Sequence, residues 1–293
     1  DVVAYIHAAE EEAAFRRVLD TGWISLTGLG LAPGASRDRL TLTTDLEAAV
    51  AGAEFVQESA PERLDLKQAL YERLGRLVPA DVVIASSTSG LTMTDIQARC
   101  ATPERTIVAH PFNPPYLLPL VEIVGGARTD PAAVAWARDF YAAAGKAPLV
   151  MRKEIPGFVA TRLQEALWRE ALHMVAEGVA STAEIDDAVR FGPGLRWSFM
   201  GTCLIFHMAG GDQGMRHMLA QFGPALKLPW TKLVAPELNE TLIDRMVEGT
   251  QEQAAGRTIK ELERQRDDAL IAVMQALKPY GVGAGRIAAE YET

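Results

Sequence analysis

The sequence predicts an α/β protein in which a doubly wound, mostly parallel sheet is followed by an all-α C-terminal domain. In the first half of the chain, short apolar runs of strand length alternate with amphipathic stretches of helix length. In the second half only helical patterns occur. Between the two halves, a proline and a glycine interrupt the pattern in Ile155-Pro156-Gly157-Phe158. We therefore expect one domain over residues 1–154 and a second over residues 155–293.

The first domain shows the strand and helix order of a Rossmann-type nucleotide-binding domain. Strands are predicted at residues 2–6, 40–43, 55–58, 82–86, 106–110, 120–124 and 148–152, and helices at residues 10–29, 64–77 and 131–144. Alternation of this kind is typical of a parallel sheet covered by helices on both faces. The turn G-x-G-x-x-G, which normally follows the first strand, does not occur in this sequence. The opening run therefore resembles a second strand, and we expect about 25–30 residues of the fold upstream of it.

The second domain is predicted to be entirely helical. A long helical pattern over residues 159–177 ends at Gly178, which has the character of a C-terminal cap. The segment from Ser181 to Glu184 matches a capping box that opens the next helix. After a break at Gly192-Pro193-Gly194, further helices are predicted at residues 198–208, 215–222, 238–253 and 258–277.

Composition and charge exclude several classes of protein. The net charge of −9 argues against nucleic acid and acidic membranes as bulk partners. The apolar runs are far shorter than the roughly 20 residues of a membrane-spanning helix. No basic segment followed by an apolar one opens the sequence, as a secretion signal would require. The only cysteines, Cys100 and Cys203, argue against a disulfide framework and favour the reducing cytoplasm. No spacing of histidines indicates a metal site.

Three polar residues stand where chemistry is expected. Ser89 follows an apolar strand, His110 ends another, and Glu122 lies inside a third. In open α/β sheets ligands bind at the carboxyl ends of the strands. A carboxylate inside an apolar strand needs a partner, because burying it alone is costly. Histidine suits the role of a general base because its ordinary pKa is about 6.5. The set can therefore remove the proton of a secondary alcohol, with the carboxylate orienting the imidazole and the serine holding the substrate oxygen.

The motifs around these residues resemble the L-3-hydroxyacyl-CoA dehydrogenase superfamily. The segments that carry the resemblance are Ser-Thr-Ser-Gly-Leu at 87–91, His-Pro-Phe-Asn-Pro-Pro at 110–115, Leu-Val-Glu at 120–122 and Pro-Gly-Phe-Val-Ala-Thr-Arg-Leu at 156–163. The resemblance implies NAD as cofactor, His110 as general acid and base, Glu122 as its orienting carboxylate, and Ser89 in contact with substrate hydroxyl and cofactor. It also places three residues near the cofactor, namely Glu62, Lys67 and Asn113.

Two positions depart from the pattern of that superfamily. Where its second strand usually ends in an acidic residue that binds the adenosine ribose, this sequence has Ile6 and His7. The preference for NAD therefore rests on the resemblance alone. Where hydroxyacyl-CoA enzymes have an asparagine after Pro-Gly-Phe, this sequence has Thr161, which keeps a hydroxyl and lacks the amide.

The segment Leu-Arg-Trp-Ser-Phe-Met-Gly at 195–201 indicates the substrate. It resembles the carnitine and gulonate dehydrogenase branches, whose substrates carry a free carboxylate, and residues 209–217 and 221–227 resemble the carnitine branch most closely. Arg196 can form a bidentate pair with a carboxylate. A trimethylammonium group favours aromatic faces. The aromatic candidates are Phe112, Tyr116, Trp197 and Phe199.

Alternatives remain at this point. Core packing is the better explanation for the aromatic residues, and an ordinary salt bridge explains Arg196 as well as a substrate contact does. Oxidation of an L-3-hydroxyacyl-CoA or of L-gulonate is an enzymatic alternative to oxidation of L-carnitine. A crystallin-like structural protein is the non-enzymatic one. The resemblance also implies a homodimer formed through the helical domain, for which Trp168, Trp230 and the methionines between residues 208 and 218 offer apolar surface.

Overall fold

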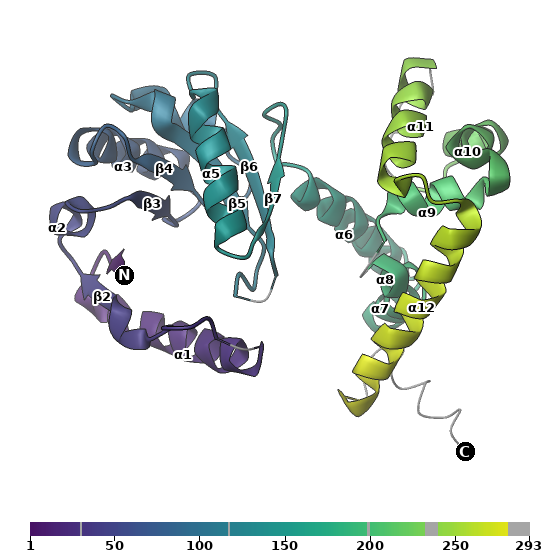
Figure 1. Ribbon diagram of the computed structural model, residues 1–293, viewed down its shortest axis with the longest axis horizontal. Helices are drawn as coiled ribbons and strands as arrows, with labels where there is room; N and C mark the ends of the chain where they lie inside the picture. Colours follow the sequence, from purple (N-terminus) through teal and green to yellow (C-terminus); the bar gives the residue numbers. More distant parts are fainter. Residues whose placement is uncertain (30, 117, 198–199, 232–239, 281–293) are drawn as a thin grey trace. The chain divides into compact units, whose positions relative to one another are not determined.

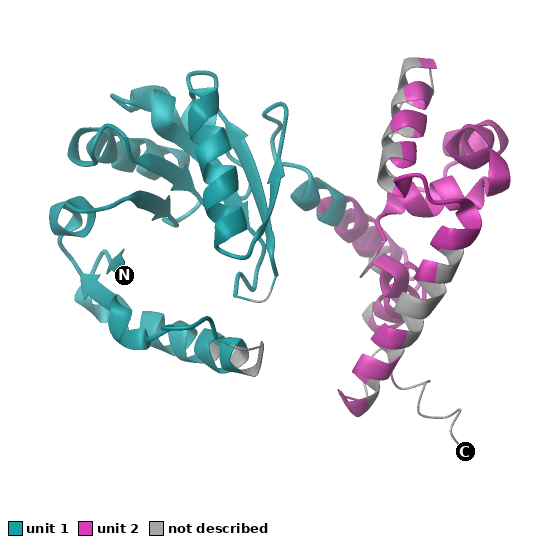
Figure 2. Ribbon diagram, viewed as in Figure 1, with its two compact units in different colours: residues 1–164 teal, residues 165–293 magenta. Residues whose placement is uncertain are grey.

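The computed structural model describes residues 1–29, 31–116, 118–197, 200–231 and 240–280. The chain forms two compact units, Asp1–Gln164 and Glu165–Thr293 (Figure 2). The first unit extends past Phe158 because the backbone of Val159 and Ala160 is bonded to Glu122 in the sheet. The domain boundary at residue 154 stays a prediction.

The main sheet of the first unit has five strands in the order β3-β4-β5-β6-β7 (Figure 1). These are β3 (Phe55–Glu58), β4 (Val83–Ser86), β5 (Thr106–Pro111), β6 (Leu120–Gly125) and β7 (Ala147–Val150). The pairs β3-β4, β4-β5 and β6-β7 are parallel, and β5-β6 is antiparallel. The prediction of a mostly parallel sheet is thus confirmed, with one reversal that the sequence pattern did not indicate.

The first two strands form a small sheet of their own. β1 (Val2–Tyr5) and β2 (Leu40–Thr43) pair in parallel and are connected through α1 (Glu12–Leu29). Among the described strands no ladder joins β1 to β3. Val2 and Val3 are 59% and 48% exposed, so these apolar side chains remain in contact with solvent. The strand expected upstream of β1 stays a prediction.

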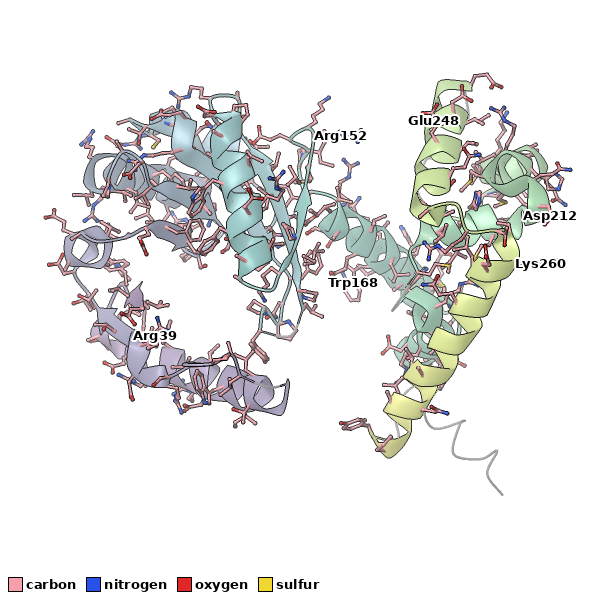
Figure 3. All side chains as sticks on the ribbon, viewed as in Figure 1. Arg39, Arg152, Trp168, Asp212, Glu248 and Lys260 are labelled. Atoms are coloured by element: carbon pink, nitrogen blue, oxygen red, sulfur yellow. The ribbon has the colours of Figure 1, made fainter. Side chains whose placement is uncertain are left out.

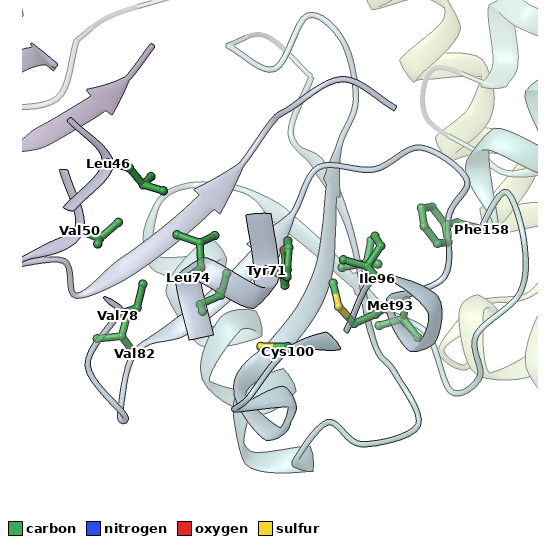
Figure 4. Close-up of a cluster of buried hydrophobic side chains, with 13 residues drawn as sticks. Leu46, Val50, Tyr71, Leu74, Val78, Val82, Met93, Ile96, Cys100 and Phe158 are labelled. Carbon is green, nitrogen blue, oxygen red and sulfur yellow. The ribbon is translucent and has the colours of Figure 1, made fainter. Parts of the chain in front are cut away.

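Two apolar cores cover the faces of the main sheet. On one face, α2 (Leu46–Val50), α3 (Leu64–Leu77) and α4 (Met93–Ile96) share one apolar core with β4 and β5, which includes the fully buried Tyr71 and Ile84 (Figure 4). On the other face, α5 (Pro131–Ala143) packs Ala133 and Ala137 against the strands. Helices α2 and α4 were not predicted, because segments of five and four residues are too short for a helical period to appear.

The second unit is helical, as predicted. Helix α6 (Ala160–Ala176) crosses into it and is followed by Gly178, whose φ of +67° fits the expected C-terminal cap. The capping box between Ser181 and Glu184 is confirmed. Pro193 begins a short helix, because proline is well suited to a first helical turn. The remaining helices are α7 (Thr182–Phe191), α8 (Pro193–Trp197), α9 (Thr202–Ala209), α10 (Gly214–Phe222), α11 (Glu240–Ala254) and α12 (Ile259–Leu277).

A small methionine-rich core holds the second unit together. Met200, Met208, Ala254 and Leu262 are buried against one another, which joins α9, α11 and α12. No helix in the described ranges has the length and apolar character needed to cross a membrane. Within the same ranges, no three His, Cys, Asp or Glu side chains gather in a way that could hold a metal ion.

A buried histidine makes the stability of the second unit sensitive to acid. The Met215 N–H donates to His207 Nδ1 at 3.2 Å, and Gly214, with φ of +62°, gives the ring its room, since a Cβ there would lie 2.6 Å from the ring. Burial lowers the pKa of His207. As the pH falls below about 6.5, the unfolded chain takes up a proton that the folded ring resists, so stability is lost.

We expect the thermal midpoint of the wild type to fall as the pH is lowered below that value. His207→Asn, whose amide oxygen can replace Nδ1 as the acceptor, removes part of this dependence. His217→Asn, at an exposed histidine of α10, keeps it unchanged. Identical pH profiles of the wild type and His207→Asn would contradict the expectation.

Candidate active site

The antiparallel pairing of β5 and β6 brings two predicted site residues together. In this register His110 lies directly opposite Glu122, although twelve residues separate them in the chain. The His110 Nδ1 and Glu122 Oε2 atoms are 3.0 Å apart. His110 is 7% exposed and Glu122 is fully buried. The buried carboxylate therefore has the partner that the sequence led us to expect.

The second oxygen of Glu122 is held by the backbone at the start of α6. The N–H groups of Val159 and Ala160 donate to Glu122 Oε1 at 2.9 and 2.8 Å. Burial acts to raise the pKa of Glu122, but the bonds from His110 and from these two N–H groups outweigh it and hold the pKa below its ordinary value. A helix N-terminus favours negative charge for the same reason. The carboxylate is therefore ionised at neutral pH.

A left-handed turn aims these backbone groups at the carboxylate. Gly157 and Phe158 have φ of +74° and +47°, and such values are uncommon for a residue with a side chain. The Phe158 side chain is fully buried, and its ring lies 5.6 Å from that of His110. Packing of this ring stabilises the turn, because it offsets the cost of the left-handed conformation.

The imidazole of His110 borders a pocket of about 530 Å³ at the carboxyl ends of β3, β4 and β5. Predicted residues that line it are Ser89, Phe112, Asn113 and Thr161. Sequence reasoning missed five other lining residues, which are Ser59, Ser87, Pro111, Pro115 and Gln164. Ser59 and Ser87 directly follow the ends of β3 and β4, and this position could have identified them as lining residues from the sequence.

Glu62 and Lys67 lie beneath the loop that carries Ser89. The Glu62 carboxylate accepts from the backbone N–H groups of Ser89 and Gly90 at 3.0 and 3.1 Å. Lys67 is 1% exposed, and its ammonium donates to Glu58 Oε1 at 2.8 Å. Their expected contact with the cofactor stays a prediction. In this structure both side chains are engaged with the protein itself.

The predicted substrate contacts are divided between the two units, with Phe112 and Tyr116 in the first and Arg196 and Trp197 in the second. Arg196 and Trp197 are on α8, and both side chains are exposed. Phe199 lies outside the described residues, and Tyr116 is half-buried in the first unit. The roles of Arg196 and Trp197 in substrate binding stay predictions.

Comparison with known proteins assigns both parts of the chain to one family. Residues 24–155 match the NAD-binding domain of 3-hydroxyacyl-CoA dehydrogenase, and residues 157–254 match the C-terminal domain of the same enzyme. The chain belongs to the 3-hydroxyacyl-CoA dehydrogenase family. As a member of this family the protein is an NAD-dependent dehydrogenase.

Curated relatives of this family member are named L-carnitine dehydrogenase. The protein of Pseudomonas putida is 58% identical over 278 residues, which are 95% of this chain and 87% of that protein. The protein of Streptomyces griseus is also 58% identical, over 94% of this chain and 82% of that protein.

Solved structures of the family share the fold. A 5-formyl-3-hydroxy-2-methylpyridine 4-carboxylic acid 5-dehydrogenase, an NAD-dependent dismutase, is 30% identical with a TM-score of 0.72, covering 95% of this chain and 91% of its own. A 3-hydroxyacyl-CoA dehydrogenase of Archaeoglobus fulgidus is 25% identical with a TM-score of 0.63, covering 82% of each chain.

The donors and acceptors of the pocket suit the nicotinamide end of this family's cofactor. Ser59, Ser87, Ser89 and Asn113 offer hydroxyl and amide groups at the carboxyl edge of the sheet, where doubly wound domains bind nucleotides. None of the lining residues in the described part of the chain carries a formal positive charge, apart from His110 when protonated. The hydroxyl and amide groups of this lining are therefore compatible with the polar carboxamide of a nicotinamide ring.

Proposed function

We propose that the protein oxidises L-carnitine at its 3-hydroxyl group, with NAD as the acceptor, to give 3-dehydrocarnitine. The observation that supports the chemistry best is the buried His110–Glu122 pair at the edge of a pocket that Ser89 also lines. Identities of 56–59% to L-carnitine dehydrogenases along nearly the whole chain support the substrate.

In the proposed mechanism, His110 acts as the general base. Its Nδ1–H donates to the ionised Glu122, so Nε2 carries the lone pair and can accept the proton of the substrate hydroxyl. Glu122 stabilises the imidazolium that forms, and Val159 and Ala160 keep the carboxylate from turning away. The Ser89 hydroxyl holds the substrate oxygen in line. NAD, when bound, supplies the acceptor for the hydride that leaves C3.

We assign each charged end of carnitine to residues that the sequence singled out for that charge. A guanidinium suits the carboxylate, for which Arg196 is the candidate, and an aromatic face suits the trimethylammonium group, for which Phe112 and Trp197 are separate candidates. Thr161 lines the pocket where hydroxyacyl-CoA enzymes have an asparagine, and it favours a small hydroxy acid over a thioester.

Arg196→Ala is expected to raise the KM for L-carnitine by about 10- to 100-fold, because a charge-assisted pair is lost on binding. The KM for NAD should stay the same, as measured by initial rates with each substrate varied. Arg190→Ala is the matched control, since this exposed arginine pairs with Asp187 on α7. An unchanged KM for L-carnitine in Arg196→Ala would disprove the carboxylate assignment.

A substrate panel tests the proposal against its alternatives. L-carnitine, L-gulonate and an L-3-hydroxyacyl-CoA are each titrated with NAD while NADH formation is followed at 340 nm. We expect the highest kcat/KM for L-carnitine. A higher value for either of the others would reassign the substrate, and turnover of none of them would favour the crystallin-like role.

We further propose a cytoplasmic homodimer that pairs through the second unit. Trp168 on α6 is 55% exposed and projects from the helix (Figure 3), and Trp230 is 72% exposed. Exposed apolar area of this kind is typical of protein interfaces. Light scattering after size-exclusion chromatography should give twice the mass of the chain. Trp168→Arg should shift that mass toward the monomer if α6 contributes to the interface.

A further inference from the structure

A buried ion pair is connected to the Ser89 loop, residues 87–92 between β4 and α4. Glu58 ends β3 and is 5% exposed, and Lys67 on α3 is 1% exposed. The Lys67 ammonium lies 2.8 Å from Glu58 Oε1 and also donates to the Ala60 carbonyl at 3.0 Å. Removing two charges from water costs about as much as their attraction returns, so such a pair is weak support for stability. Because the pair lies beside the Ser89 loop, a role in positioning that loop would explain its presence.

Two chains of polar contacts run from Glu58 to the Ser89 loop, one made of hydrogen bonds and one that includes an ion pair. In the first, the Ser86 hydroxyl donates to Glu58 Oε2 at 2.6 Å and accepts from the Thr88 N–H at 3.2 Å. Ser86 and Thr88 are almost fully buried. The beginning of the loop is therefore bonded to the carboxylate of Glu58.

The second chain passes through Lys67 to Glu62. The Lys67 ammonium is 3.7 Å from Glu62 Oε2, and Glu62 Oε1 accepts from the Thr88 hydroxyl and from the N–H groups of Ser89 and Gly90. Burial acts to raise the pKa of Glu62, but these bonds and the Lys67 charge outweigh it and lower the pKa. The end of the loop is therefore held by a carboxylate that Lys67 anchors.

We propose that Glu58 is a positioning residue for Ser89. It fixes the loop at both ends, through Ser86 and through Lys67 and Glu62, so that the Ser89 hydroxyl stays in line with His110. Glu58 does not line the pocket and acts only through these neighbours. The role of Ser89 in turnover rests on the proposed function. The part of the proposal in which Glu58 fixes the loop does not depend on that function.

Amide hydrogen exchange in the Ser89 loop tests, without any substrate, whether Glu58 fixes the loop. In Glu58→Gln the amide keeps the size of the side chain and removes the charge that anchors Lys67. We expect the amides of Ser89 and Gly90 to exchange about tenfold faster or more than in the wild type, while the core strand β5 keeps its protection. Glu72→Gln is the matched control, because Glu72 pairs with Arg76 and Arg99 on the surface of the same region. Unchanged exchange at Ser89 and Gly90 in Glu58→Gln would overturn the proposal.

Turnover then separates positioning from general destabilisation. Glu58→Gln should lower kcat about tenfold or more, since a small misplacement of a reacting group has effects of this size. In a Ser89→Ala background the same substitution should cause little further loss, because the group that it positions is gone. If the loss of kcat in the double variant equalled the product of the two single losses, the positioning role of Glu58 would be wrong. Should Glu58→Gln fail to fold, Glu58→Gln/Lys67→Met removes both charges and is expected to fold and show the same two effects. If Glu58→Gln exchanges faster but the wild type does not turn over carnitine, the structural role of Glu58 in the loop is supported. Only the proposed function is then disproved.

Discussion

His110→Gln is expected to lower kcat for the proposed oxidation of carnitine by about 10²- to 10⁴-fold, which is the range that a positioned general base contributes. The substituted side chain can still reach Glu122, but it has no lone pair of comparable basicity for the substrate hydroxyl. The binding of NADH, measured by fluorescence titration, should change little. The loss therefore falls on kcat rather than on the affinity for cofactor.

His173→Gln is the matched control for this substitution. His173 lies on α6 with an exposed side chain, so its replacement should leave kcat unchanged. If His110→Gln kept full activity, another group would have to be the base, and the proposed mechanism would be wrong.

Glu122→Gln has the second largest expected effect, a loss of about 10²- to 10⁴-fold in kcat. An uncharged amide cannot stabilise the imidazolium, and its N–H₂ group can drive the ring into the wrong tautomer, as a comparable substitution does in serine proteases. The folded protein should also lose stability, because the amide oxygen must accept from Val159 and Ala160, which leaves the N–H₂ group, a donor, facing His110 Nδ1 in place of an acceptor.

The pH dependence of stability measures how much the ionised Glu122 carboxylate contributes to the folded state. The pKa of Glu122 is lowered in the folded state, so its contribution to stability is complete above the unfolded value of about 4.3 and is lost as the pH falls through the lower folded value. Glu122→Gln should remove that part of the acid dependence. Glu154→Gln is the control, since the Glu154 carboxylate accepts from the N–H and the hydroxyl of Thr94. Full activity of Glu122→Gln would contradict the orienting role.

Strand and helix order, and the partnership of His110 with Glu122, could be predicted because they depend on periodicity and on the cost of a lone buried carboxylate. The antiparallel turn from β5 to β6 could not, since periodicity does not record strand direction. The left-handed φ of Phe158, which directs the N–H groups of Val159 and Ala160 to Glu122, could not be predicted either, because phenylalanine rarely adopts it. Lys67 shows the same limit. Its position on α3 was predicted, but only packing decides that its ammonium turns inward to Glu58.

Transfer of deuterium from L-[3-²H]carnitine to NAD tests the central claim most directly. The wild-type protein should convert the labelled substrate to 3-dehydrocarnitine and give reduced cofactor that carries one deuterium, detected by mass spectrometry. His110→Gln should give far less of both products at the same protein concentration. Reduced cofactor without deuterium, or no carnitine-dependent reduction by the wild type, would contradict oxidation at C3 of carnitine.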